Sequence, residues 1–408
     1  MLPAVSVIFG FFFGAAFGSF LNVVIYRLPR NMSLAQPPSH CPKCQHRLGG
    51  LDLFPLLSFL LAGAKCRYCR APIGLRYFMV ELLMGVIWAA LWWQLLVEGN
   101  DIGRFVALAA FATALVAALF IDLEHYIIPD SINAIILLIG LAYNGWLISQ
   151  GGGMFTFAGI TLPASIAGWI VGALVMWGIA FGGRVFLGRD AMGHGDIKLA
   201  RGMGAVLFPA AALISFGLSI VIGLVFGIIS IMLSKKVAKP TPINKPVSLT
   251  FDRVEVRDAV GQLFAAADTK YVIDSDIKGT ITADFETENF EDAADEIARQ
   301  VGGEWNYVNN AWKLSLEEEP ESVGSLTKAG VGYLLLVDVF ALFWPKLEEK
   351  WFGPAYLAEE VEGEDDWVPG PTHIPFGPAL AVAAILVVLF ESTFSGWLQA
   401  YWDFALRR

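Results

Sequence analysis

Long uncharged apolar runs alternate with short polar stretches over most of the chain. Each run is close to the ~20 helical residues that cross a ~30 Å hydrocarbon core. The pattern therefore predicts a mostly α, polytopic helical membrane protein with about eight spans. The expected spans cover residues 3–26, 77–97, 105–122, 131–149 and 157–182, two segments within 196–233, and 376–391.

Two of these runs need a further argument. Residues 196–233 would extend roughly 57 Å as one helix, too long for one crossing, so a break is expected near Pro209. Residues 3–26 could be a cleaved signal peptide. However, no Lys or Arg precedes the run and no small-residue cleavage site ends it, so an uncleaved anchor is favoured.

Composition agrees with a membrane protein, and the charge distribution divides the chain into two parts. The sequence is 56% hydrophobic and 16% charged, which excludes a disordered chain. Residues 234–373 contain 27 Asp/Glu against 13 Lys/Arg, whereas the remainder is net positive. Residues 234–245 are a basic linker, and the acidic residues follow it. No nucleic-acid partner is expected.

Charge also predicts orientation. Residues 27–76 contain eight basic side chains and one acid, Asp52. Because positive loops stay in the cytoplasm, this loop is expected to be cytoplasmic. Alternation then puts the turn at 122–130 and the loop at 183–197 on the same side.

All four cysteines lie in this first loop, as two C-x-x-C pairs separated by 21 residues. Each pair can bind a metal through two sulfurs, and a reducing cytoplasm disfavours disulfides. The loop is therefore predicted to be a zinc-ribbon-like domain with a structural Zn²⁺, since four thiolates leave no open coordination position. The ligands are Cys41, Cys44, Cys66 and Cys69.

Two carboxylates at the cytoplasmic edge are candidates for chemistry. Asp122 ends one span and Asp196 begins another, within Met192-Gly193-His194-Gly195-Asp196-Ile-Lys198. Two carboxylates that share a proton can act as general base and general acid on a peptide. Gly193 and Gly195 would let an extended substrate backbone approach. Asp130, after Pro129, is expected to be a helix N-cap.

Together these residues resemble the bacterial type IV prepilin leader peptidases, membrane aspartic peptidases of the GxGD type. The likeness covers about 1–233 and 374–392. It rests on Gly18-Ser-Phe-Leu-Asn22-Val-Val-Ile-Tyr-Arg27-Leu-Pro29, both cysteine pairs, Arg76-Tyr-Phe-Met-Val-Glu81, Asp122 through Asp130, Met192 through Lys198, and Ile374-Pro-Phe-Gly-Pro378.

The resemblance implies that Asp122 and Asp196 are catalytic. Gly193, Gly195 and Lys198 are expected to bind substrate. It implies cleavage of a prepilin or pseudopilin leader on the cytoplasmic face of the bacterial inner membrane. Many members also methylate the new N-terminus with S-adenosylmethionine; no residues for that cofactor are assigned.

Residues 246–318 interrupt the family pattern. Strand and helix periodicities alternate as β-α-β-β-α-β-β, which predicts a small inserted α+β domain. It resembles the short N-terminal domain of secretins and TonB-dependent receptors in "VSLTFDRVEVRDAVGQLF", "YVIDSDIKGTIT" and "FEDAADEIARQVG". Docking of a pilus or secretion-machine component is one interpretation, and an insert without essential role is the other.

The remaining boundaries follow from charge and length. Residues 319–373 are expected to contain an interfacial or re-entrant helix at 331–344, with a further span as the alternative, and then an acidic loop. The full division is 1–26, 27–76, 77–233, 234–245, 246–318, 319–373, and 374–408 with the last span and tail.

Two other functional classes compete with a peptidase. A non-catalytic assembly factor would bind partners through the insert, but would not need both aspartates in their glycine and proline settings. An ion-coupled transporter would need carboxylates near mid-membrane, whereas these lie at an edge. The interpretation as a membrane peptidase in contact with lipid and prepilin is therefore preferred.

Overall fold

The described residues form two compact units, which are considered separately. The computed structural model describes residues 2–187, 192–233, 246–267, 269–273, 277–308, 311–316, 331, 336–344, 346, 350, 375–391, 393–394 and 396. One unit holds the apolar helices and the cysteine loop, and the other holds the insert.

Six helices of the first unit are long and apolar enough to cross a membrane. This confirms the prediction of a multi-pass helical membrane protein. Their segments are α1 (Leu2–Arg27), α3 (Leu75–Leu91) continued by the π-helix η1 (Trp92–Glu98), α4 (Ile102–His125), α5 (Asp130–Ser149), α6 (Ala164–Leu187) and α7 (His194–Leu233). A shorter apolar helix, α14 (Gly377–Leu389), and α2 (Leu57–Leu61) complete the main helices of this unit.

α7 is broken where the sequence predicted it. Phe208 has φ 62° and ψ 170°, outside the helical region, immediately before Pro209. A proline disfavours the helical conformation of the residue before it, so the break follows from the Phe-Pro pair. The ring of Phe208 stacks on that of Tyr143, with centroids 5.8 Å apart. α7 thus consists of two helical segments, as expected.

The predicted start of the fifth span is wrong. Residues 154–163 form a hairpin of β1 (Met154–Phe157) and β2 (Ile160–Pro163), and α6 begins only at Ala164. The two-residue turn, Ala158 and Gly159, has φ of 50° and 82°. Positive φ at both positions is typical of a hairpin turn, so local turn chemistry overrides the apolar composition.

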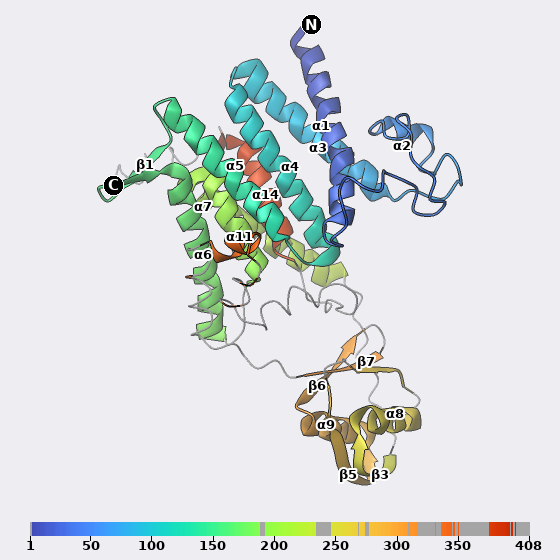
Figure 1. Cartoon of the computed structure of the whole chain (residues 1–408). Coiled ribbons are helices and arrows are strands. Elements are labelled where there is room, and N and C mark those ends of the chain that lie inside the picture. Colours follow the sequence, from blue (N-terminus) through green and yellow to red (C-terminus); the bar gives the residue numbers. More distant parts are fainter. Residues whose placement is uncertain are drawn as a thin grey trace. The chain divides into compact units, whose positions relative to one another are not determined.

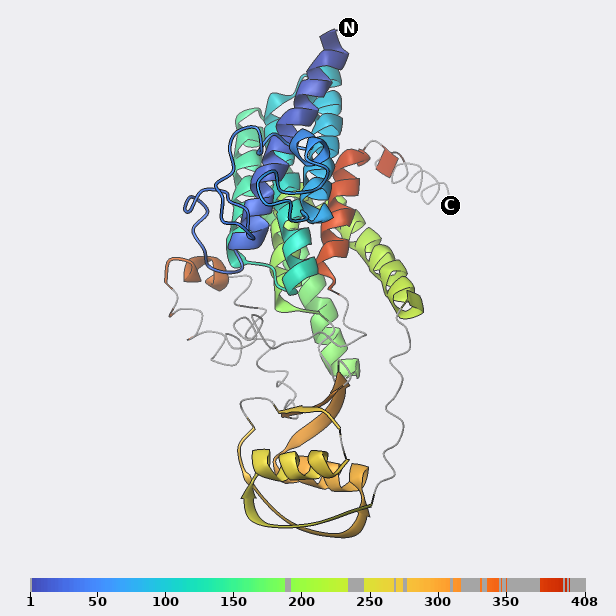
Figure 2. The same cartoon turned by 90° about the vertical axis from the view of Figure 1, so that its right-hand side faces the viewer.

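α14 completes the bundle although it comes from the far end of the chain. It packs against α4 in both views (Figure 1 and Figure 2). Glycines allow the backbones of the core helices to touch: Gly140 of α5 meets Ala205 of α7, and Gly168 of α6 meets Gly204. Small residues at such crossings are typical of helix packing in membranes.

The insert has the predicted element order. It consists of β3 (Pro246–Glu255), α8 (Val256–Ala267), β4 (Tyr271–Ile273), β5 (Thr280–Asn289), α9 (Phe290–Gln300), β6 (Gly303–Val308) and β7 (Ala311–Leu316). β3 pairs with β5, and a second sheet has the order β4-β7-β6. The insert has a hydrophobic core of its own, which includes Phe264, Phe290 and Trp305.

The helix predicted at 331–344 is represented in the described residues by a shorter helix. A single turn and a half, α11 (Val337–Ala341), follows a left-handed Leu336 and contacts α5. Residues 332–335 and the acidic loop at 351–373 lie outside the described residues, as do the linker 234–245 and the tail from 397.

The aromatic centre of the insert yields a stability prediction. Phe264 is fully buried, and its ring lies 5.0 Å from Phe290 and 4.9 Å from Trp305. Phe264→Ala should destabilise residues 246–318, expressed alone, by about 3–5 kcal/mol because it leaves a cavity. Urea unfolding followed by circular dichroism measures this. The exposed Gln262→Ala on the same helix is the control; an equal loss in both variants would contradict the assigned core.

Candidate active site and metal site

The four cysteines converge as the sequence predicted. Their sulfur atoms all lie within 4.8 Å of one another, and Cys41 Sγ is 3.8 Å from Cys69 Sγ. Tetrahedral zinc with Zn–S bonds of about 2.3 Å requires sulfur separations of about 3.8 Å. The cluster therefore fits a four-thiolate metal ion.

The two pairs are built alike. Cys41 N donates to His46 O and Cys66 N donates to Ala71 O, and a left-handed residue, Gln45 or Arg70, follows each second cysteine. The backbone N–H groups of Cys44 and Lys43 bond to the Cys41 thiol, and that of Ala71 bonds to the Cys69 thiol. The N–H of Cys44 is the largest influence on Cys41 and, against burial, lowers its pKa to about 6. A thiolate is the form that binds zinc.

The thiol of Cys69 behaves in the opposite way. The Ala71 N–H lowers its pKa, but burial and hydrogen bonds with the other three thiols outweigh this and raise it to about 11. Without a metal, therefore, the sulfurs cannot all be ionised at neutral pH, since each thiolate opposes the next. A dication in the centre would remove that conflict and release protons as it binds.

Asp122 occupies the last turn of α4 and is 5% exposed. The helix ends three residues later, at His125, because Tyr126 is left-handed and its N–H bonds to the carbonyl of Asp122. Gly377, at the start of α14, lies against the Asp122 carboxylate, and a Cβ there would collide with Oδ2. The glycine in Pro-Phe-Gly-Pro is thus required by contact with the candidate carboxylate.

Asp196 lies in the first turn of α7, at the same end of the bundle. It is near enough to Asp122 for the two carboxylates to interact electrostatically. Ile128 lies between the two segments: a Cβ on Gly377 would be 2.8 Å from its Cδ1, and one on Gly195 would be 3.5 Å from its Cβ. A Cβ on Gly193 would stand 3.5 Å from Asp196 Oδ2. Gly377, which touches Asp122, and Gly195, which adjoins Asp196, thus both lie against this one isoleucine.

Lys198 is buried, and its ammonium binds Asp130. Nζ lies 2.8 Å from Oδ1 and 3.0 Å from Oδ2, and the Lys198 side chain has no exposed surface. The expectation that Asp130 is an N-cap is therefore wrong: the cap position is Pro129, and Asp130 is the first residue of α5. A buried cation requires a counter-charge, which explains why the Asp130 carboxylate binds Lys198 and does not cap the helix. A role of Lys198 in substrate binding stays a prediction.

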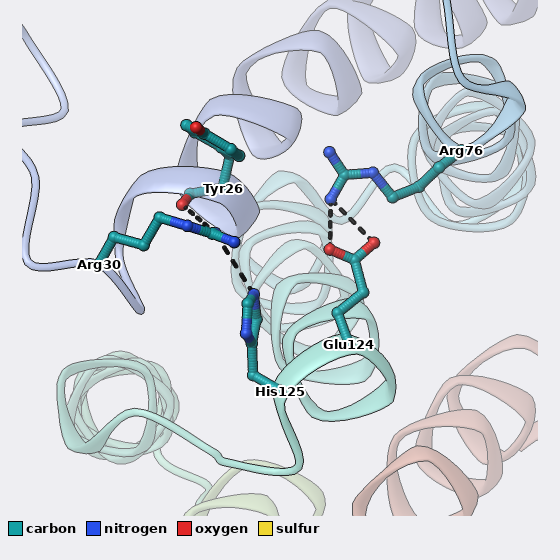
Figure 3. A network of polar contacts seen from close by, with 5 residues as sticks. All are labelled: Tyr26, Arg30, Arg76, Glu124 and His125. Atoms are coloured by element: carbon teal, nitrogen blue, oxygen red, sulfur yellow. Dashed lines mark hydrogen bonds and ion pairs between the residues drawn. The ribbon is translucent and has the colours of Figure 1, made fainter. Parts of the chain in front are cut away.

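A second group of polar side chains lies at the C-terminal end of α4 (Figure 3). Arg76 of α3 donates through Nη1 to both carboxylate oxygens of Glu124, at 2.9 and 2.7 Å. Arg30 donates to Tyr26 O at 2.8 Å and lies 3.4 Å from His125 Nε2. These contacts tie the ends of α1 and α3 to residues just after Asp122.

Sequence reasoning missed Glu81 as a structural residue. It is a carboxylate inside the α3 span, 9% exposed, and Oε2 accepts the Leu56 N–H at 2.7 Å. The sequence could have indicated this role, because an acidic residue within an apolar span needs a polar partner.

Comparisons with known proteins agree with this arrangement. Residues 12–95 match the bacterial peptidase A24 N-terminal domain, and residues 109–228 match the type IV leader peptidase family. A relative from Aeromonas hydrophila, named prepilin leader peptidase/N-methyltransferase, is 34% identical over 57% of this chain and 84% of its own length. This chain belongs to the type IV leader peptidase family.

A second relative extends the likeness. A protein of the same name from Myxococcus xanthus is 30% identical over 96% of this chain and 92% of its own length. That alignment runs along the inserted region as well. No solved structure matches the chain. The likeness of the insert to secretin domains stays a prediction.

The cysteine cluster yields a metal prediction. Purified protein should contain about one zinc per chain, and Cys41→Ser with Cys44→Ser should remove it, since two sulfurs are too few for a closed site. Elemental analysis measures the metal. The variant's loop, residues 31–75, should also become sensitive to trypsin at Lys43 and Arg47. Metal-free wild-type protein with an intact loop would contradict the assignment.

The buried ion pair yields a second prediction. Lys198→Met or Asp130→Asn alone should destabilise the protein by about 3–5 kcal/mol, because each leaves a buried polar or charged group unpaired. The double variant should recover much of that loss. Thermal unfolding in detergent measures both effects. Strictly additive losses in the double variant would mean that the two side chains do not depend on each other.

Proposed function

We propose that the chain is a membrane aspartic endopeptidase that cleaves the leader peptide of type IV prepilins or type II secretion pseudopilins. The observation that carries the proposal is the convergence of Asp122 and Asp196 from separate helices at one end of the bundle. The family assignment and the names of the relatives support the same activity.

The chemistry proposed for the pair is hydrolysis by an activated water. One ionised carboxylate takes a proton from water as it attacks the scissile carbonyl, and the protonated partner donates a proton to the departing amine. Two neighbouring carboxylates favour a single shared proton, because both cannot easily ionise together. The pair is thereby supplied with one base and one acid.

The substrate is proposed to approach along the glycines beside Asp196. Gly193 is exposed, and a side chain there would project toward the Asp196 carboxylate. An extended peptide could therefore lie close to the pair. Lys198 is proposed to support this segment through its bond to Asp130 and to contribute to substrate binding by holding Asp196 in place.

Orientation follows from charge. The basic loop 27–76 favours the cytoplasm, and Arg30, Arg76 and His125 cluster at the end of the bundle that carries Asp122. We propose that the protein lies in the bacterial inner membrane with the aspartates facing the cytoplasm. A prepilin leader would reach them before its hydrophobic segment leaves the membrane.

N-methylation of the cleaved product is proposed as the second activity. Both relatives carry N-methyltransferase in their names, and the match to the A24 N-terminal domain covers the cysteine loop and its flanking spans. S-adenosylmethionine would supply the methyl group.

The insert, with its separate core, is proposed to bind a component of the pilus or secretion machine.

The aspartates yield the decisive prediction for cleavage. Asp122→Asn and Asp196→Asn should each lower the rate by roughly 10⁴-fold or more, and the double variant should be no worse than either single one. Asparagine preserves shape but can serve neither as base nor as acid in this exchange. Co-expression with a prepilin, followed by mass analysis of its N-terminus, reports cleavage and methylation together.

Glu124→Gln is the matched control, because Glu124 lies on the same helix end as Asp122 and is also a carboxylic side chain. Loss of its exposed ion pair should reduce the rate by at most about fivefold. If Asp122→Asn cleaves at the wild-type rate, or if Glu124→Gln is as inactive as Asp122→Asn, the assigned pair is wrong. An inactive wild-type protein with folded loop and spans would favour the assembly-factor alternative.

A further inference from the structure

The cysteine loop contains an uncharged apolar segment, Leu53–Ala64, that neither the metal site nor the aspartate pair uses. Its sequence is Leu-Phe-Pro-Leu-Leu-Ser-Phe-Leu-Leu-Ala-Gly-Ala, between Asp52 and Lys65. It contains α2. Charge counting places the whole loop in water, where such a run of large apolar side chains is unfavourable.

The segment lies beside α1, level with the middle of that helix. The ring of Phe54 is 6.3 Å from that of Phe12 in α1. Phe12 is 15 residues before Arg27, which is about 22 Å along the helix. Figure 1 and Figure 2 both show α2 level with the middle of α1 and not beyond its C-terminal end.

Contacts with α3 hold the segment there. The Glu81 carboxylate accepts the N–H of Leu56, which has a left-handed φ of 62° at the start of α2. Phe59 packs on Phe78 with ring centroids 5.2 Å apart. The buried acid within the α3 span, for which the cleavage chemistry has no use, thus anchors the segment to the wall of the bundle.

The outer face of the segment is apolar and exposed. Leu61 is 83% exposed and Leu60 is 60% exposed. The neighbouring face of α1 is exposed in the same way: Phe9 is 60% exposed and Phe20 is 52% exposed. Since α1 is a membrane span, the surface that continues from it at the same depth faces the same solvent, which is lipid.

Most backbone N–H groups of the segment are bonded within the protein. Non-helical chain within the hydrocarbon region must satisfy its polar groups internally. Pro55 has no N–H, and Leu56 donates to Glu81. Donors to carbonyls of the same loop are Leu53, Leu57, Ser58, Leu60, Ala62, Gly63 and Ala64.

We propose that residues 53–64 form a re-entrant segment that enters the bilayer from its cytoplasmic side, held by Glu81, with the acyl chains of lipids as its partner. The loop is then divided: the cysteine pairs lie in water and this segment lies in lipid. The insertion is independent of cleavage, so it holds or fails separately from the peptidase proposal.

Depth-dependent quenching tests the proposal on the full chain in nanodiscs. A fluorescent amino acid is placed at Leu61 by codon suppression, and at the charged, exposed Arg47 of the same loop as the control. Lipids carry a nitroxide on the acyl chain or on the headgroup. The probe at 61 should lose most of its emission to the acyl-chain nitroxide and little to aqueous iodide. The probe at 47 should show the reverse.

Three results would overturn the proposal. Quenching at 61 by iodide would place the segment in water. Quenching at 61 by the headgroup nitroxide alone would place it on the surface of the bilayer. Protection from every quencher would mean that protein, such as a second copy of this chain, covers it.

A charge scan supplies the second measurement. Leu61→Lys should lower the midpoint of thermal unfolding in nanodiscs by roughly 5 °C or more, because it brings an ammonium into lipid. Leu34→Lys, at an exposed leucine elsewhere in the loop, should leave the midpoint unchanged. Equal midpoints for the two variants would contradict insertion.

Discussion

The buried ion pair between Lys198 and Asp130 is the interaction on which the site depends. It joins the second turn of α7 to the first residue of α5. Lys198 is two residues after Asp196, and Asp130 is eight residues after Asp122. A buried ammonium without its carboxylate would be strongly unfavourable. The pair therefore fixes the relative position of two segments that the sequence separates by 68 residues.

The rest of the site is organised around this bond by close backbone contacts. Gly377 brings α14 against the Asp122 carboxylate, and Gly195 brings the start of α7 against Ile128. Farther along, Gly140 and Gly168 let α5 and α6 touch α7. Bundle packing in a membrane depends on such small residues. Arg76 and Glu124 add a connection from the N-terminal domain to the end of α4.

The sequence was sufficient where a local pattern determines the structure. Apolar runs gave the spans, the Phe-Pro pair gave the break in α7, and the spacing of cysteines gave the metal cluster. It was insufficient where contacts between residues distant in sequence determine the structure. Asp130 looked like an N-cap because its partner, Lys198, is remote in sequence. The hairpin at 154–163 was missed because its residues are largely apolar and resemble the start of a span. The position of residues 53–64 depends on contacts with Glu81 and Phe12.

The central claim, that Asp122 and Asp196 form one site, can be tested without activity. Cysteines are introduced as Asp122→Cys and Asp196→Cys in zinc-loaded protein in native membranes, treated with a short bis-maleimide, and located by mass spectrometry. The account predicts a linked peptide that joins positions 122 and 196. Modification of both cysteines without a link between them would contradict it.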